Sequence, residues 1–119
     1  MSPMQQINFE DLKKEKRLLL VSGDSELVQV TTRIYRWYGY IVRGETSSSK
    51  ALNTMTEFSP QIILLDINID ERSGLELIHD MKRCGRDCNI LLFTGNEEPE
   101  IIKEAWRAGA FFFLRRVIL

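Results

Sequence analysis

The feature that most constrains the fold of this 119-residue chain is a regular alternation of two kinds of segment. Short apolar runs predict buried strands, and they alternate with longer segments whose apolar residues recur every three or four positions, as in helices with one buried face. The expected strands are residues 17–21, 40–43, 61–66, 89–93 and 111–114, and the expected helices are residues 25–38, 50–58, 74–83 and a segment from about 99 to Gly109. This alternation predicts an α/β fold with a parallel sheet and helices on both faces.

The first expected helix illustrates how a buried face is assigned from spacing. Its apolar residues recur in steps of three and four and are expected to face the sheet: Leu27, Val28, Val30, Ile34, Tyr35 and Tyr38. Trp37 and Trp106 also lie on expected helices, and both are expected to pack.

Composition and charge limit the classes of protein to which this chain can belong. Its hydrophobic fraction is 44%, its charged fraction is 28% and its formal net charge is −1, as in an ordinary soluble domain. The chain is not strongly basic, so its composition gives no indication of nucleic-acid binding. No apolar run is long enough to span a membrane. The first residues lack the pattern of a signal peptide, so we expect a cytoplasmic protein.

The chain length predicts one domain, which we place at residues 17–119 after an N-terminal extension, residues 1–16. Residues 8–16 are expected either to form a short helix or to be disordered. Cys84 and Cys88 have neither the spacing nor the second pair of a zinc site, so reduced thiols are expected. His79, the only histidine, is expected at the surface.

One carboxylate stands out, because Asp66 ends the apolar run 62–65 and a turn-rich loop follows it. Open α/β sheets bind ligands at the carboxyl ends of their strands, so Asp66 is a candidate functional residue. The structural alternative is that Asp66 only caps the turn from the strand into the loop.

Several short motifs lie in or next to the expected strands, in a fixed order along the chain. They are Asp66 with Asn68 two positions and Gly74 eight positions later, Thr94-Gly95 after the fourth strand, Ala108-Gly109-Ala110 before the fifth, Phe113 within it and Arg116 after it. In this order and spacing the chain resembles a receiver domain of a bacterial response regulator over residues 17–117. The resemblance implies a flavodoxin-like, doubly wound five-stranded sheet of order 2-1-3-4-5, with the site between strands one and three.

The resemblance also implies a function in two-component phosphorelay signalling. A histidine kinase or phosphotransfer protein would phosphorylate Asp66, and Mg²⁺ would bridge the phosphoryl group and protein oxygens, among them Asp66 and the backbone carbonyl of Asn68. Thr94 and the cation at Arg116 would hold the phosphoryl oxygens. Thr94 and the aromatic residue Phe113 would then switch a surface that binds a downstream output domain or protein. Such a domain would be a signalling protein and not an enzyme.

The metal-binding part of this pattern is incomplete. The family has two acidic residues directly after the first strand, and this chain has Ser22 and Gly23 there. Asp24 lies one position too far along, so it reaches a metal only if the strand slips by one residue; otherwise it caps the first helix. Because Mg²⁺ favours several oxygen ligands, carboxylates above all, we expect weak binding.

The end of the chain departs from the family as well. Arg116 replaces a lysine, and it either contacts the phosphoryl group or forms a resting ion pair with Asp66. Val117 replaces a proline, and the final helix of the family is missing or truncated. Its absence would expose apolar surface, which favours homodimerisation, exchange of a strand or helix, or aggregation, unless residues 7–16 cover the gap.

Two functional hypotheses follow from these matches and departures. Asp66, Thr94 and Arg116 favour a receiver domain that accepts a phosphoryl group, whereas Ser22 and Gly23 favour a pseudo-receiver, a phosphorylation-independent module for protein interaction. A flavin-binding protein of flavodoxin type fits poorly, because residues 22–25 are too short and too acidic for its phosphate loop.

Overall fold

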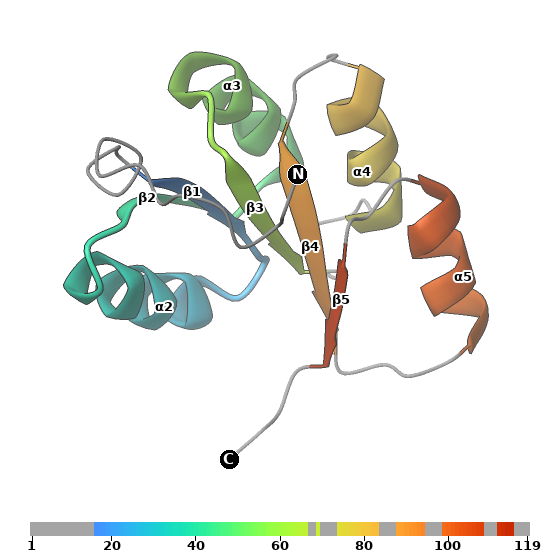
Figure 1. Ribbon diagram of the computed structural model, residues 1–119, viewed down its shortest axis with the longest axis horizontal. Helices are drawn as coiled ribbons and strands as arrows, with labels where there is room; N and C mark the ends of the chain where they lie inside the picture. The colour runs from blue at the N-terminus through green and yellow to red at the C-terminus, as the bar shows by residue number, and fades with distance from the viewer. Residues whose placement is uncertain are drawn as a thin grey trace, which may run out of the picture.

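A computed structural model of the chain describes residues 16–66, 69, 74–83, 88–94, 99–108 and 112–115. Strands and helices alternate along it, as Figure 1 shows. The strands are β1 (Arg17–Val21), β2 (Ile41–Glu45), β3 (Ile62–Asp66), β4 (Asn89–Thr94) and β5 (Phe112–Arg115). The helices are α2 (Ser25–Trp37), α3 (Ser48–Phe58), α4 (Gly74–Arg83) and α5 (Pro99–Ala108). The expected order of elements is confirmed.

The strands form one parallel five-stranded sheet in the order β2-β1-β3-β4-β5. This is the doubly wound, flavodoxin-like order that the resemblance implied, and β1 and β3, the strands at the switch, lie side by side. The boundaries differ most at β2, which continues through Gly44 to Glu45, beyond the expected end at residue 43. A side chain at Gly44 would collide with Val28 of α2, so the glycine lets helix and strand pack closely.

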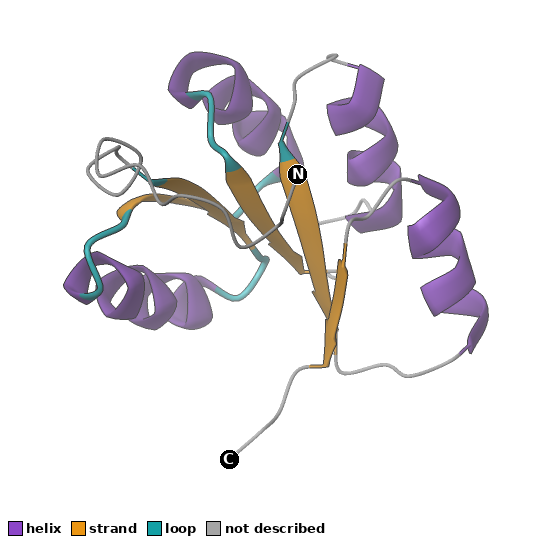
Figure 2. Ribbon diagram, viewed as in Figure 1, coloured by secondary structure: helices purple, strands orange, loops and turns teal. Residues whose placement is uncertain are grey.

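The two faces of the sheet are covered differently. Figure 2 shows α2 on one face and α3, α4 and α5 on the other. Successive residues of β1 point to opposite faces, so Leu19 packs under α3–α5 while Leu20 packs under α2. The larger cluster includes Met55, Ile63, Leu77 and Ile90, all fully buried. The smaller one consists of Leu18, Leu20, Val28, Val42 and Leu64, with partly buried neighbours such as Tyr35.

The expected buried face of α2 was wrong in part. Val28 and Thr32 are its buried residues, whereas Val30 and Ile34 are about half exposed, at 48% and 49%. The expectation that both tryptophans pack was also wrong, because Trp37 is 86% and Trp106 57% exposed. An apolar stripe on α2 therefore faces away from the sheet. His79 is exposed, as expected.

Some expectations concern residues outside the described ranges. These are the N-terminal extension before residue 16, the bond between Arg116 and Val117, and the missing or truncated final helix. Within the described part of the chain, each helix is too short or too polar to cross a membrane.

Candidate functional site at the end of strand β3

The site is built around Asp66, the last residue of β3, which is 4% exposed. A carboxylate this buried needs partners, and the neighbouring strands determine which residues are close. The register pairs Val21 of β1 with Leu65, so the residue after Val21 lies beside Asp66. On the other side, Asp66 pairs with Phe93 of β4, which places the backbone of Thr94 one position further on.

Ser22 is the residue that β1 delivers to Asp66. It is fully buried, and its hydroxyl donates a hydrogen bond of 2.7 Å to Asp66 Oδ2. The Asp24 N–H donates to the same hydroxyl over 3.1 Å, and the Ser22 N–H donates to the Glu45 carbonyl over 3.2 Å. The hydroxyl thus has both a donor and an acceptor, as a buried polar group requires.

Position 23 requires glycine because there is no room for a side chain, and not because of an unusual backbone conformation. A Cβ placed on Gly23 would collide with the carbonyl oxygen of Ile69 and lie 2.8 Å from its carbon. Ile69 is itself 7% exposed and belongs to the larger core cluster. The chain after β3 therefore passes directly against Gly23, and only glycine fits there without a shift of that backbone.

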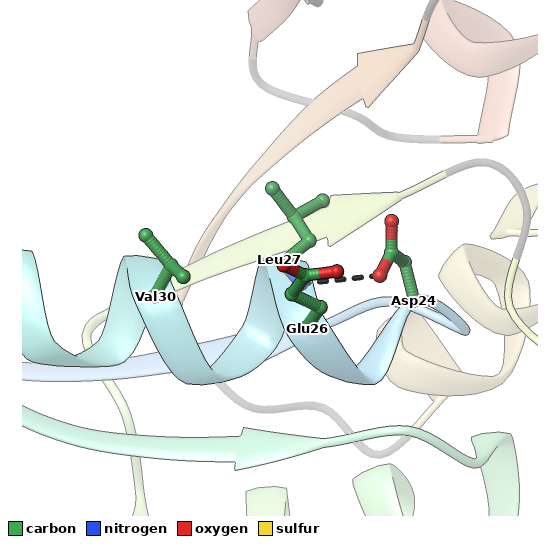
Figure 3. Close-up of a pocket in the computed structure, with 4 residues that line it drawn as sticks. All are labelled: Asp24, Glu26, Leu27 and Val30. Carbon is green, nitrogen blue, oxygen red and sulfur yellow. Dashed lines mark hydrogen bonds between the residues drawn. The ribbon is translucent and has the colours of Figure 1, made fainter.

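Asp24 caps helix α2, which is the structural role that the sequence left open. Its Oδ1 accepts a hydrogen bond of 3.1 Å from the Leu27 N–H, drawn as a dashed line in Figure 3. Its backbone has the extended conformation of an N-cap, with φ −88° and ψ 100°. β1 pairs with β3 without the slip that would have moved Asp24 to the position of a metal ligand.

These residues do not fit a magnesium site of the family type. Of the three positions after β1, the first is a hydroxyl bonded to Asp66, the second has no room for a side chain, and the third caps a helix. Among the described residues no three histidine, cysteine or acidic side chains are grouped so as to hold a metal ion. Mg²⁺ favours carboxylate oxygens, and here Asp66 stands beside a hydroxyl instead.

The other predicted site residues are placed only in part. Thr94 ends β4 and pairs with Arg115 of β5, so the backbones of both strands reach the edge where Asp66 lies. Phe113 of β5 pairs with Leu92 of β4, so the whole of β4 lies between the strand of Phe113 and the strand of Asp66. Asn68 and Arg116 lie outside the described residues.

Comparison with known proteins agrees with this geometry. A sequence profile described as "Response regulator receiver domain" matches residues 18–118, nearly the whole chain. The chain belongs to this family. It is thus a receiver domain of the two-component response regulators, and its flavodoxin-like fold is the one found in solved receiver structures.

Three relatives illustrate the similarity. The chemotaxis protein CheY of Thermotoga maritima is 27% identical over 100 residues, which cover 83% of this chain and 83% of that protein. The regulatory protein AtoC of Escherichia coli is 24% identical over 82% of this chain, but this chain spans only 21% of AtoC. The structure of a response regulator from Burkholderia pseudomallei has a TM-score of 0.82 at 24% identity, covering 88% of this chain and 62% of that one.

Sequence reasoning missed the role of Ser22 in this receiver domain. It identified Ser22 only as the residue where an acid was absent, not as a partner of Asp66. The signal was available, since pairing the strands 17–21 and 61–66 in parallel places residues 22 and 66 side by side. The contact between Gly23 and Ile69 carried no such signal, because it depends on the path of a loop.

Proposed function

We propose that this receiver domain accepts a phosphoryl group on Asp66 from a histidine kinase or a phosphotransfer protein. The observation that carries the proposal is the position of Asp66: a buried carboxylate at the carboxyl end of β3, flanked by β1 and by the backbone of Thr94. The response regulator from Burkholderia pseudomallei contains a phosphorylated aspartic acid together with a calcium ion. The same modification at Asp66 is the natural extension to this chain.

The transfer itself asks for position and charge compensation. A carboxylate oxygen of Asp66 attacks phosphorus, the bond from phosphorus to the histidine nitrogen of the donor breaks, and the imidazole takes up a proton from solvent. The product is an acyl phosphate with added negative charge at a buried edge of the sheet. Ser22 supplies a hydroxyl donor there, and we assign Thr94 and Arg116 as the further donors to the phosphoryl oxygens.

The output follows from those contacts. A phosphoryl group shifts a conformational equilibrium only through contacts that differ between the two states. We assign this role to Thr94, at the end of β4, and to Phe113, on the adjacent strand β5. Their movement would change the surface near α5 and β5, to which an output domain or protein binds. We place this signalling in the cytoplasm.

A second copy of the chain is a further proposed partner, because α2 presents an exposed apolar surface. Its exposed apolar stripe consists of Val30, Ile34 and Trp37, at positions i, i+4 and i+7. At the N-terminal end of the stripe lies a hollow of about 260 Å³ lined by Asp24, Glu26, Leu27 and Val30, whose side chains Figure 3 shows along one stretch of the helix.

Antiparallel pairing of two α2 helices matches these features. It places Trp37 of one copy over the apolar, acid-rimmed hollow of the other. Glu26 and Arg33 are about two turns apart and so lie on one flank of the stripe. In a two-fold antiparallel pair that flank meets its own copy, which brings each Glu26 toward an Arg33. The contact is small beside a standard interface of roughly 800 Å² per partner, so a weak dimer is expected.

Intact-mass spectrometry after incubation with acetyl phosphate or phosphoramidate tests the phosphoryl transfer. We expect the wild type to gain one phosphoryl group and Asp66→Asn to gain none. Asp80→Asn on α4 is the matched control and should be phosphorylated like the wild type. If the folded wild type gains no phosphoryl group from either donor, with MgCl₂ or with EDTA, the proposal is contradicted. The remaining hypothesis is then the pseudo-receiver, a phosphorylation-independent module for protein interaction.

A further inference from the structure

The Ser22 hydroxyl is in direct contact with the Asp66 carboxylate. Its bond to Oδ2 is 2.7 Å long, an ordinary length for an O–H···O hydrogen bond, and a hydroxyl that donates to a carboxylate makes a stronger bond than one that donates to a neutral oxygen. Ser22 is completely enclosed, so water does not compete for this contact. In a receiver with an acid at this position, the side chain next to the phosphoacceptor carries negative charge and has to share a cation. Here it donates a proton instead.

The two positions after Ser22 are occupied by other contacts. A carboxylate at position 23 would collide with the Ile69 backbone. The Asp24 carboxylate accepts from the Leu27 N–H at the start of α2, and the Asp24 N–H donates to Ser22. The three residues after β1 thus form one connected set of hydrogen bonds that ends on Asp66 through a hydroxyl.

We infer that Ser22 is a positioning residue that replaces the divalent cation in this receiver domain, so that Asp66 is phosphorylated independently of Mg²⁺. The inference rests on the proposed role of Asp66. The Ser22 hydroxyl donates to the carboxylate before transfer and to an oxygen of the acyl phosphate afterwards. Its proton stays on Ser22 throughout, and the backbone N–H of Asp24 holds the hydroxyl in place.

The first experiment measures whether the unphosphorylated wild type binds a divalent cation. Its outcome does not depend on whether Asp66 accepts a phosphoryl group. Mn²⁺ is paramagnetic and broadens the NMR signals of amides near a bound ion. We expect MnCl₂ to leave the amide signals of Ser22 and Asp66 no broader than those of exposed control residues, and MgCl₂ to leave Tm unchanged at constant ionic strength. Saturable broadening confined to the Asp66 site, with ligands from the loop 67–73 included, would overturn the inference.

Ser22→Asp tests the same point by restoring the first acid. Two carboxylates are then close together, so this variant should have a lower Tm than the wild type and regain stability when MgCl₂ is added. Ser49→Asp, on the exposed start of α3, is the control for added charge and should show no such gain. If Ser22→Asp fails to fold even with MgCl₂, the Mn²⁺ experiment on the wild type still decides.

Ser22→Ala tests the hydroxyl itself. We expect its rate of phosphorylation by phosphoramidate to fall about tenfold or more, as for the loss of a hydrogen bond to a charged group. The wild-type rate should be equal in EDTA and in MgCl₂, whereas the Ser22→Asp rate should depend on MgCl₂. A Ser22→Ala rate equal to or above that of the wild type, or a wild-type rate that falls in EDTA, would overturn the inference. No phosphorylation of the wild type at all would contradict the proposed function and not the cation result.

Discussion

The two faces of the sheet differ in the helices that cover them and in the size of the hydrophobic cluster beneath those helices. Under α3, α4 and α5, side chains from three helices and from β1, β3 and β4 meet in one large cluster, which also includes Ile69 from the loop beside Gly23. On the opposite face α2 packs over β1 and β2, and the cluster there has five buried hydrophobic residues among those described. The outer side of α2 carries the exposed apolar residues Val30, Ile34 and Trp37.

The two faces of the sheet therefore have different roles: one provides most of the stability of the domain, and the other provides a surface for association. Apolar burial contributes roughly 25 cal/mol per Å², so most of the described stabilisation comes from the face under α3–α5. The same face fixes Ile69 and hence the backbone that excludes a side chain at Gly23. The α2 face contributes less to folding and leaves the stripe around Ile34 and Trp37 available to another molecule.

Leu19 and Leu20 compare the faces most directly, because they are adjacent on β1, almost equally buried and point in opposite directions. Leu19→Ala should lower the free energy of unfolding by about 4 kcal/mol, since the tightly packed cluster cannot close the cavity. Leu20→Ala should cost about 2.5 kcal/mol, because α2 is freer to move inward. Urea denaturation measures both values, and equal costs would show that the faces are equally rigid.

Helix caps provide a smaller test of the same comparison. Asp24 caps α2, and Ser47 caps α3 by accepting from the Lys50 N–H at 3.3 Å. Replacing either residue by alanine should cost about 1 kcal/mol. Hydrogen exchange should separate them: Asp24→Ala should speed exchange locally in α2, whereas α3 in Ser47→Ala should open only with the whole domain. Local opening of α3 to the same extent would contradict the division between the faces.

The two exposed tryptophans give the smallest effect on stability and the clearest test of association. Trp37→Ser and Trp106→Ser should each change the free energy of unfolding by no more than about 0.5 kcal/mol. Only Trp37→Ser should weaken self-association, because Trp106 lies on α5, away from the α2 stripe. Sedimentation velocity over a range of concentrations measures this. A wild type that remains monomeric throughout would exclude the α2 dimer.

The sequence predicted the order and type of the elements well because each depends on local periodicity. The sheet order was available through the family resemblance. The orientation of α2 was not predictable in the same way, since Val28 and Val30 have identical side chains and yet differ in burial on one helix. Choosing between the two stripes requires knowing where Gly44 allows close approach, and that is a tertiary contact.

The site was predictable in its centre and less so in its surroundings. Asp66 was identified from a strand followed by a loop, and the absence of acids at residues 22 and 23 was visible in the sequence. The proximity of Ser22 to Asp66 could be inferred by pairing the two strands in parallel, whereas the crowding at Gly23 depends on a tertiary contact with Ile69. Assignments to Asn68, Thr94, Phe113 and Arg116 remain predictions.

The contact between Gly23 and the Ile69 carbonyl has an evolutionary consequence. A lineage with this loop can change residue 22 in one step, but residue 23 accepts a side chain only after the backbone at Ile69 has moved. The order of substitutions therefore matters: an acid at position 23 is harmful in the present background and tolerable in another. Descendants of this protein would acquire a pair of acids at residues 22 and 23 only after the backbone at Ile69 had moved.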